Sequence, residues 1–321
     1  MKKTIFAILA TVAMVACSND EIVSLNQEAI QFGNAFVDNS VRGAYDPSYG
    51  ATNKVDGVDT PINLTSLRVY GAVNGVNIYN NVEVAGTVGA TVWSFVGTVP
   101  TQYWIAGADY TFDAVVDATS VTQDAATLLP TSLYYEASSQ KDMLHQRVTC
   151  NGKINNDGIV PFVFTHLLSK VKLTVENTTV AAATGYRYTI SDIVLTNAYA
   201  SGKYAVDSGE WSETTAGTHS IANMTIASHT TEECATEVLL IPGAKLGITF
   251  NVKVEMFDTV ANTWKTITTT PKTYTDVVTL VANTAYNFKV SVGLNEEVKF
   301  TATTLNGWVN STPTTNPLPQ N

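Results

Sequence analysis

The chain has 321 residues, of which 45% are hydrophobic and 14% charged, and this composition excludes an intrinsically disordered protein. Its formal net charge is −10 and no cluster of basic residues offsets it, which excludes a nucleic-acid partner and an electrostatically bound membrane surface. Thr and Val occupy 46 and 38 positions, and these β-branched residues favour strands over helices. The composition therefore predicts an all-β protein.

The first residues have the pattern of a bacterial export signal. Lys2 and Lys3 precede an uncharged apolar run at 5–15, which has the length of a signal-peptide core and is too short to span a bilayer. Small residues then lead to Cys17, and a polar, acidic stretch follows, as in a lipoprotein signal. We expect residues 1–16 to be the signal peptide and Cys17 to carry acyl chains such as palmitate, which anchor a protein to a membrane. The alternative is an ordinary signal peptide that a cysteine follows by coincidence.

A single strand is predicted between this signal and the main body of the chain. Residues 29–37 read as a short strand, because Ile30 and Phe32 alternate with a polar residue and Phe36 follows a break at a glycine. A turn-rich linker comes next and contains an isolated Arg42, which is open to a protease in such a segment. The sequence thus indicates a separate strand ahead of a linker that can be cut.

The main body reads as a series of short strands from residue 64 onward. Gly, Pro and Asn separate the strands at close intervals, which is the spacing of a β-sandwich. At 170–175, Lys and Thr alternate with apolar residues and predict a strand with one solvent-exposed face. Residues 139–145 are the candidate for a brief helix.

A turn-rich segment at 151–158 divides the predicted strands into two series. We therefore expect two β-sandwich domains in tandem, at 43–158 and 159–321, with a transthyretin-like or Greek-key order of strands. Cys150 and Cys234 form a disulfide only if the fold brings their Cα atoms close together, and the sequence leaves this open.

The sequence carries no motif of an enzyme, a metal site or a cofactor site. It lacks a nucleophile elbow, the glycine-rich phosphate loops, and Cys or His pairs at metal-ligand spacing. Asn155–Gly158 invites comparison with a calcium loop, but Lys153 and Phe164 occupy the first and last ligand positions, which favours a hairpin turn. Five Trp residues offer stacking surfaces for sugars, but no polar cluster accompanies them, which favours core packing. We expect no catalytic residue, no cofactor and no metal.

The ends of the chain and one central segment carry its remaining distinctive features. These are the lipoprotein signal ending at Cys17, the predicted strand at 30–37, and the segments Asn39–Arg42, Phe162–Val171 and Asn306–Trp308. Together they resemble the fimbrillin (type V pilin) family of Gram-negative anaerobic bacteria. The resemblance implies a structural, non-enzymatic subunit of a fimbria that supports adhesion. It also implies export as a lipoprotein to the outer membrane and assembly on the outside of the cell.

The resemblance further implies assembly by proteolysis and strand exchange. In this family an Arg- or Lys-specific surface protease removes the N-terminal segment, and a strand from the C-terminal region of a neighbouring subunit fills the vacated groove. Carried onto this chain, the cut falls between Arg42 and Gly43, with Lys54 as the second candidate, and 17–42 becomes a removable propeptide. A strand supplied in trans pairs the N–H and C=O groups that the gap would leave open.

The candidate donor strand lies near the C-terminal end. Val298, Phe300 and Ala302 alternate along one apolar face, and the segment continues to Trp308 and Val309. Three prolines follow and exclude a central strand in the tail beyond it. The implied partners are other copies of this chain or related fimbrial subunits, the surface protease, the outer membrane through the lipid of the precursor, and a host or bacterial surface ligand. The alternative is an outer-membrane surface lipoprotein that binds glycans and does not polymerise.

Overall fold

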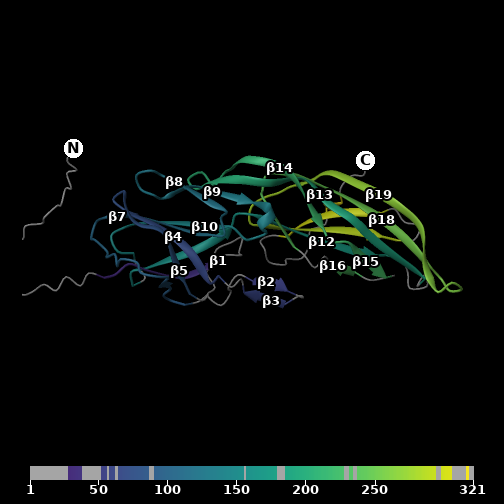
Figure 1. Ribbon diagram of the computed structural model, residues 1–321, viewed down its shortest axis with the longest axis horizontal. Helices are drawn as coiled ribbons and strands as arrows, with labels where there is room; N and C mark the ends of the chain where they lie inside the picture. Colours follow the sequence, from purple (N-terminus) through teal and green to yellow (C-terminus); the bar gives the residue numbers. More distant parts are fainter. Residues whose placement is uncertain are drawn as a thin grey trace, which may run out of the picture.

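The computed structural model describes residues 28–37, 52–55, 58–61, 64–86, 90–154, 157–178, 185–227, 231–233, 237–293, 298–305 and 316–317. Within these residues nearly every element is a strand, and one short 3-10 helix, η1, spans Ala137–Ser139. The all-β prediction is therefore confirmed. The molecule is elongated, with strands such as β4, β5 and β7 at one end and the β18–β19 hairpin at the other (Figure 1). No helix among the described residues is long and apolar enough to cross a membrane.

The first sheet has seven strands in the spatial order β1-β11-β10-β7-β4-β5-β6. They are β1 (Gln31–Val37), β4 (Ser66–Val73), β5 (Val76–Ala85), β6 (Ser94–Phe95), β7 (Asp109–Val116), β10 (Leu144–Asn151) and β11 (Ile159–His166). Only the β1–β11 pair is parallel. Just before β6, Trp93 N donates to Phe32 O of β1 at 2.8 Å. The sheet therefore closes on itself, and β1 is the strand that joins its two edges.

Two further sheets face each other in the rest of the chain. The second sheet contains β12 (Ser169–Asn177), β16 (Thr231–Glu233), β17 (Val238–Leu240), β20 (Thr284–Val292), β21 (Lys299–Leu305) and β22 (Asn316–Pro317). The third contains β8 (Ser120–Gln123), β9 (Pro130–Glu136), β13 (Tyr186–Ala205), β14 (Trp211–Ile221), β15 (Met224–Ala227), β18 (Lys245–Asp258) and β19 (Thr263–Thr279). Strands β2 (Thr52–Val55) and β3 (Val58–Pro61) pair only with each other among the described strands.

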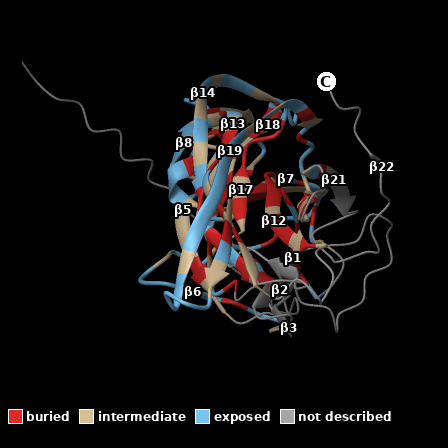
Figure 2. Cartoon of the chain, turned by 90° about the vertical axis from the view of Figure 1, so that its right-hand side faces the viewer, coloured by how far each residue is buried: buried red, intermediate tan, exposed pale blue. Residues whose placement is uncertain are grey.

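Each part of the molecule has its own apolar core, and a third cluster joins them. The first core lies inside the closed sheet, and the second lies between the second and third sheets. The joining cluster packs Tyr70 and Val115 of the first sheet against Leu133 and Tyr135 of β9 and Leu168 beside β12. Figure 2 shows the buried residues inside, while the outer strands β14 and β19 are largely exposed. The two parts are thus held together by apolar packing as well as by the chain.

The division between the parts differs from the expected one at 158 and 159. β10 and β11 pair antiparallel in the first sheet, so the turn-rich segment between them connects a hairpin. Asp157 and Gly158 adopt positive φ values of 52° and 73°, which suit such a turn. The chain instead passes from the first sheet to the second at Leu167 and Leu168, between β11 and β12. The β8–β9 hairpin also crosses over, since β9 pairs with β13 of the third sheet.

Two local predictions are corrected. The face of β12 expected to be exposed is largely covered: Lys170 is 7% exposed and forms an ion pair with Glu237, and Thr174 donates to Asn287 Oδ1 at 2.6 Å. β12 is an inner strand between β20 and the β16 and β17 strands, so its polar groups need partners in the protein. The helix predicted at 139–145 does not form: η1 ends at Ser139, where the left-handed φ of 48° at Gln140 stops it, and β10 begins at Leu144.

Cys150 lies half-buried on β10, and this burial raises the pKa of its thiol. Cys234 lies outside the described residues, so the possible disulfide between the two cysteines stays untested.

A buried charge cluster stiffens the first sheet and reaches the third. Asp113 on β7 is fully buried, and its carboxylate accepts hydrogen bonds from Arg147 Nε at 2.9 Å and from Arg147 Nη2 at 2.9 Å. The His145 ring lies 2.7 Å from the same carboxylate. Arg147 also donates to Pro130 O at 2.9 Å, at the start of β9, and contacts the Asp207 carboxylate just after β13. The cluster therefore links β7 and β10 to two strands of the third sheet.

Candidate functional site

The candidate site is the groove that holds β1, which we call the β1 groove. β11 forms one edge, where Phe32 pairs with Val160 in a parallel register. The segment 91–104 forms the other edge: Trp93 N donates to Phe32 O at 2.8 Å, and Ile30 N donates to Gln102 O at 2.8 Å. Trp104 N donates to the carbonyl of residue 28 at 3.0 Å. Removing β1 would leave backbone groups unpaired along both edges.

The Phe32 side chain fills the centre of the groove. It is 1% exposed and lies among four aromatic rings, which we call the aromatic box. The ring centroid of Phe32 is 5.4 Å from Tyr79, 5.9 Å from Phe95, 5.6 Å from Phe112 and 5.8 Å from Phe162. Three of these contacts are edge-to-face, and the Phe162 ring is stacked. The groove therefore presents an apolar, aromatic-lined position to whatever strand occupies it.

Two further β1 side chains enter the first core. Ile30 and Ala35 are each 2% exposed, whereas Gln31 between Ile30 and Phe32 is exposed. Burying a large apolar side chain contributes about 1.5–3 kcal/mol, so Ile30 and Phe32 together bind β1 firmly. The Glu28–Lys153 ion pair beside the groove is 45% and 42% exposed, and an exposed pair contributes about 1 kcal/mol or less. Apolar burial and backbone pairing thus hold β1 in place.

Gly33 lies where the backbone of the opposite edge comes closest to β1. A Cβ atom at this position would lie 1.8 Å from Thr91 O and 3.0 Å from Ile159 Cγ2. Two residues further along the same edge, the Trp93 ring packs so closely on Gly86 that a Cβ on that glycine would lie 2.5 Å from it. Only glycine therefore fits the β1 groove one position after the buried aromatic residue.

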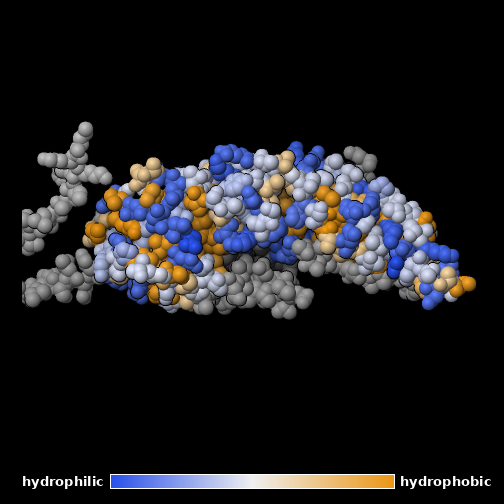
Figure 3. All heavy atoms as spheres, viewed as in Figure 1, coloured by the Kyte–Doolittle hydropathy of each residue, from blue (hydrophilic) through white to orange (hydrophobic). Residues whose placement is uncertain are grey.

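Exposed apolar side chains surround the second edge of the groove. Val92, Val96, Tyr103 and Ile105 are 44%, 50%, 43% and 54% exposed. Hydrophobic residues are also frequent on the surface at the end of the molecule that the first sheet forms (Figure 3). Apolar residues gathered on a surface mark places where another protein binds.

The predicted removable strand is present, and several residues predicted to act with it are not described. Ile30 and Phe32 lie in the groove, and the backbone of Phe36 pairs with Val163. Cys17, Arg42 and Gly43 lie outside the described residues.

The candidate donor strand is paired within its own chain. β21 runs antiparallel to β20, with Phe300 opposite Val290 and Ala302 opposite Phe288. Phe300 is 6% exposed, and its ring lies 4.9 Å from Tyr274 and 5.4 Å from Phe288.

The rest of the candidate donor strand flanks this pairing. Val298 O accepts a hydrogen bond from the Tyr274 hydroxyl at 3.2 Å. Trp308 and Val309 lie outside the described residues. Donation of residues 298–305 to a neighbour therefore requires β21 to leave the second core.

Sequence reasoning did not find the second edge of the groove. Two of its residues, Trp93 and Trp104, were predicted to pack in the core, and they are 3% and 7% exposed, which confirms the interpretation for these two, whereas Trp211 and Trp264 are only half-buried. Trp104 Nε1 also donates to Gly158 O at 3.0 Å. Residues 91–95 and 103–105 were among the predicted short strands, but the periodicity of a strand does not say which other strand it pairs with.

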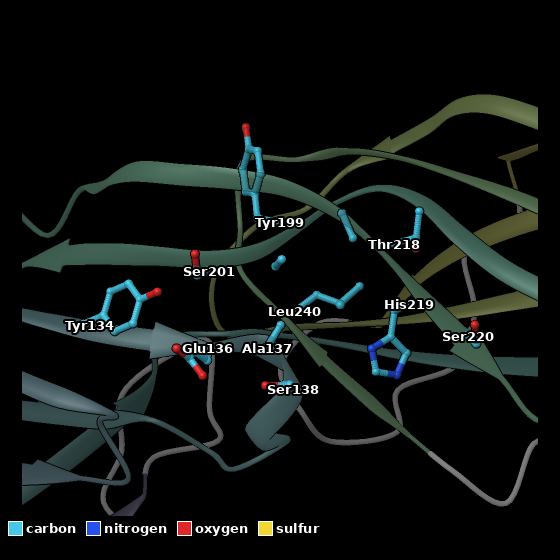
Figure 4. Close-up of a pocket in the computed structure, with 12 residues that line it drawn as sticks. Tyr134, Glu136, Ala137, Ser138, Tyr199, Ser201, Thr218, His219, Ser220 and Leu240 are labelled. Carbon is cyan, nitrogen blue, oxygen red and sulfur yellow. The ribbon is translucent and has the colours of Figure 1, made fainter.

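A second candidate site is a hollow of about 450 Å³ between β9, η1, β13 and β14. Tyr134, Glu136 and Ser201 lie toward one end of it and His219 toward the other, with Ser138 between (Figure 4). Burial lowers the pKa of His219, which keeps its ring neutral at pH 7. Among the described residues that line the hollow, Glu136 is the one carboxylate. Hydroxyls, an imidazole and a carboxylate beside a tyrosine ring suit a neutral polyhydroxyl ligand.

The comparisons with known proteins identify the family. A sequence model described as fimbrillin-like matches residues 51–308. The chain belongs to the fimbrillin-like family. This membership supports a role as a fimbrial subunit and a location at the cell surface. A search of curated proteins found no match to the chain.

Solved structures share the fold of this fimbrillin-like protein. A fimbrial protein from Bacteroides vulgatus is 13% identical with a TM-score of 0.58, over 88% of this chain and 99% of that chain. A putative cell adhesion protein from Bacteroides ovatus is 17% identical with a TM-score of 0.51, over 89% of this chain and 99% of that chain. At such identities the likeness shows the common fold alone.

Proposed function

We propose that this fimbrillin-like protein is a structural subunit of a cell-surface fimbria that polymerises by strand exchange at the β1 groove. The observation that carries the proposal is the position of β1, which closes the first sheet and fills its core although it belongs to the N-terminal end of the chain. A linker that contains Arg42 follows it in the sequence. One cut in that linker leaves β1 held only by non-covalent contacts.

The departure of β1 after this cut would also release the subunit from the membrane. Acylation of Cys17 would hold the precursor in the outer membrane, and residues 17–42 contain both this cysteine and β1. Once β1 leaves, a strand from the C-terminal region of a neighbouring subunit takes its place and pairs with both edges. A contact between unlike surfaces of successive subunits does not close on itself, so it builds a filament.

Replacing Arg42 by Ala is expected to block processing of the precursor. On the cell surface, where the other fimbrial subunits are present, an Arg-specific protease should convert the wild-type precursor into a product that starts at Gly43, and this product should join ladders that resist mild denaturant. N-terminal sequencing and gel electrophoresis measure both results. Lys54→Ala is the matched control and should be processed normally. An Arg42→Ala protein that the Arg-specific protease still cuts and that assembles normally would disprove this cleavage site. If only a Lys-specific protease gives an assembling product, and that product starts at Val55, the site moves to Lys54.

The hollow beside β9 favours a second candidate function, the binding of a neutral glycan by a surface lipoprotein that does not polymerise. On a glycan array the intact protein should then show saturable binding. Glu136→Ala is expected to weaken it about tenfold or more, because a hydrogen bond to a charged group contributes about 1.5–3 kcal/mol. Glu210→Ala, an exposed carboxylate that does not line the hollow, is the control. Equal binding by the two variants would exclude the hollow as the site.

A further inference from the structure

We infer that the β1 groove selects a strand in which an aromatic residue is followed directly by glycine, and that a different fimbrial subunit supplies this strand. Residues 298–321 of a second copy would not fill the groove. The inference rests on the strand exchange proposed above and names the partner for it.

The aromatic requirement comes from the box around Phe32. Four rings lie with their centroids 5.4–5.9 Å from that of Phe32, and the Phe32 side chain is 1% exposed. A smaller side chain at this position leaves a cavity among rigid rings, and a polar side chain enters an apolar site without water. A replacement strand therefore needs an aromatic side chain at this position to match the packing of β1.

The glycine requirement comes from the backbone of the opposite edge. The bond between Trp93 N and Phe32 O fixes the register, and the next residue then meets Thr91 O. Even the Cβ of alanine would lie 1.8 Å from that oxygen, and the wall is backbone, which cannot rotate away. The Ile159 side chain forms the side wall, and its Cγ2 would lie 3.0 Å from the same Cβ. Any strand with a side chain here must shift out of register and lose the aromatic contact.

The C-terminal segment of this chain does not meet these two requirements. Residues 298–321 contain one glycine, Gly307, and Asn306 precedes it. When Gly307 faces Thr91, the amide of Asn306 enters the aromatic box, and burying an amide without a partner is unfavourable. Phe300 is followed by Thr301 rather than glycine, and its side chain is already buried in the second core.

The partner strand can be described from β1 itself. It runs parallel to β11 and has a large apolar residue, one free position, an aromatic residue and glycine, with a small residue two positions after the glycine, as in Ile30–Ala35. The free position at Gln31 is exposed. A subunit whose donor segment has this pattern occupies the groove in the assembled fimbria.

The test is a peptide exchange experiment on the full-length chain after it has been cut between residues 42 and 43. If the natural sequence is not cut there, a protease site is inserted at this position. Labelled peptides compete with β1, and native mass spectrometry follows their uptake. The peptides are residues 28–38, the same peptide with Phe32→Ala, Gly33→Ala or Gln31→Ala, and residues 298–315. We expect uptake of the 28–38 peptide and its Gln31→Ala form. We expect about 100-fold weaker binding of the Phe32→Ala and Gly33→Ala forms and no uptake of residues 298–315.

The outcomes separate this inference from the proposed function. If the unmodified 28–38 peptide does not exchange, the groove does not release its strand and the proposed function fails. If that peptide exchanges and the Gly33→Ala peptide or residues 298–315 bind equally well, strand exchange stands and the selectivity inferred here is wrong.

Discussion

Replacing Phe32 by Ala in the uncut precursor is expected to lower the free energy of unfolding by about 3–5 kcal/mol, the range for truncating a fully buried Phe. The ring is 1% exposed and contacts four aromatic rings, which are too well packed to fill the space it leaves. Denaturant titration of the purified precursor measures the change. Gln31→Ala is the matched control, because its side chain is exposed on the same strand, and its effect should be within about 0.5 kcal/mol.

The same substitution should loosen β1 specifically. Amide exchange should rise at Trp93, whose N–H donates to Phe32 O, and at β11. Phe288→Ala removes a fully buried ring from the second core and should destabilise the chain without this local change. An unfolding free energy within 1 kcal/mol of wild type for Phe32→Ala would contradict the role of the aromatic box.

The N-terminal strand could be predicted from the sequence, but its position in the fold could not. The alternation of Ile30, Gln31 and Phe32 is a local signal that depends on three neighbouring residues. Its partners, Val160 and Trp93, lie far away in the chain, and periodicity does not say which strands pair. The residue pattern therefore indicated a strand near a predicted cleavage site. That this strand fills a groove was implied only by the family resemblance, and the strands that line the groove could not be predicted from the pattern.

Gly33 was interpreted as a break in the strand, since glycine weakens strands in isolation. In the structure it is the point where two backbone segments approach each other, with Thr91 O in the place of a side chain.

In β12 the sequence pattern was clear but predicted the wrong environment. Its alternating Lys and Thr residues predicted an exposed face, but packing on both sides gives Lys170 an ion-pair partner instead. In both cases the deciding contact is made by residues that are distant in sequence.

Replacing Asp113 by Ala is expected to lower the free energy of unfolding by about 3–5 kcal/mol, because it removes the buried partner of a hydrogen-bonded ion pair. Asp113 is fully buried, and Arg147 donates to both of its carboxylate oxygens, with Nε–oxygen distances of 2.9 and 3.1 Å. Without the carboxylate, Arg147 keeps Pro130 O and the exposed Asp207, and His145 loses its partner.

Denaturant titration again measures the effect, with Glu213→Ala as the control. Glu213 forms an ion pair with Lys203 at 2.7 Å, but its side chain is 68% exposed, so this pair should contribute about 1 kcal/mol or less. A similar small effect for Asp113→Ala would show that the cluster is not a source of stability. Because Arg147 also bonds to Pro130 O at the start of β9, the variant should in addition raise amide exchange along β9. Faster amide exchange along β9 would show that the Asp113–Arg147 cluster connects the first and third sheets. Unchanged exchange there would show that the cluster stabilises the first sheet alone.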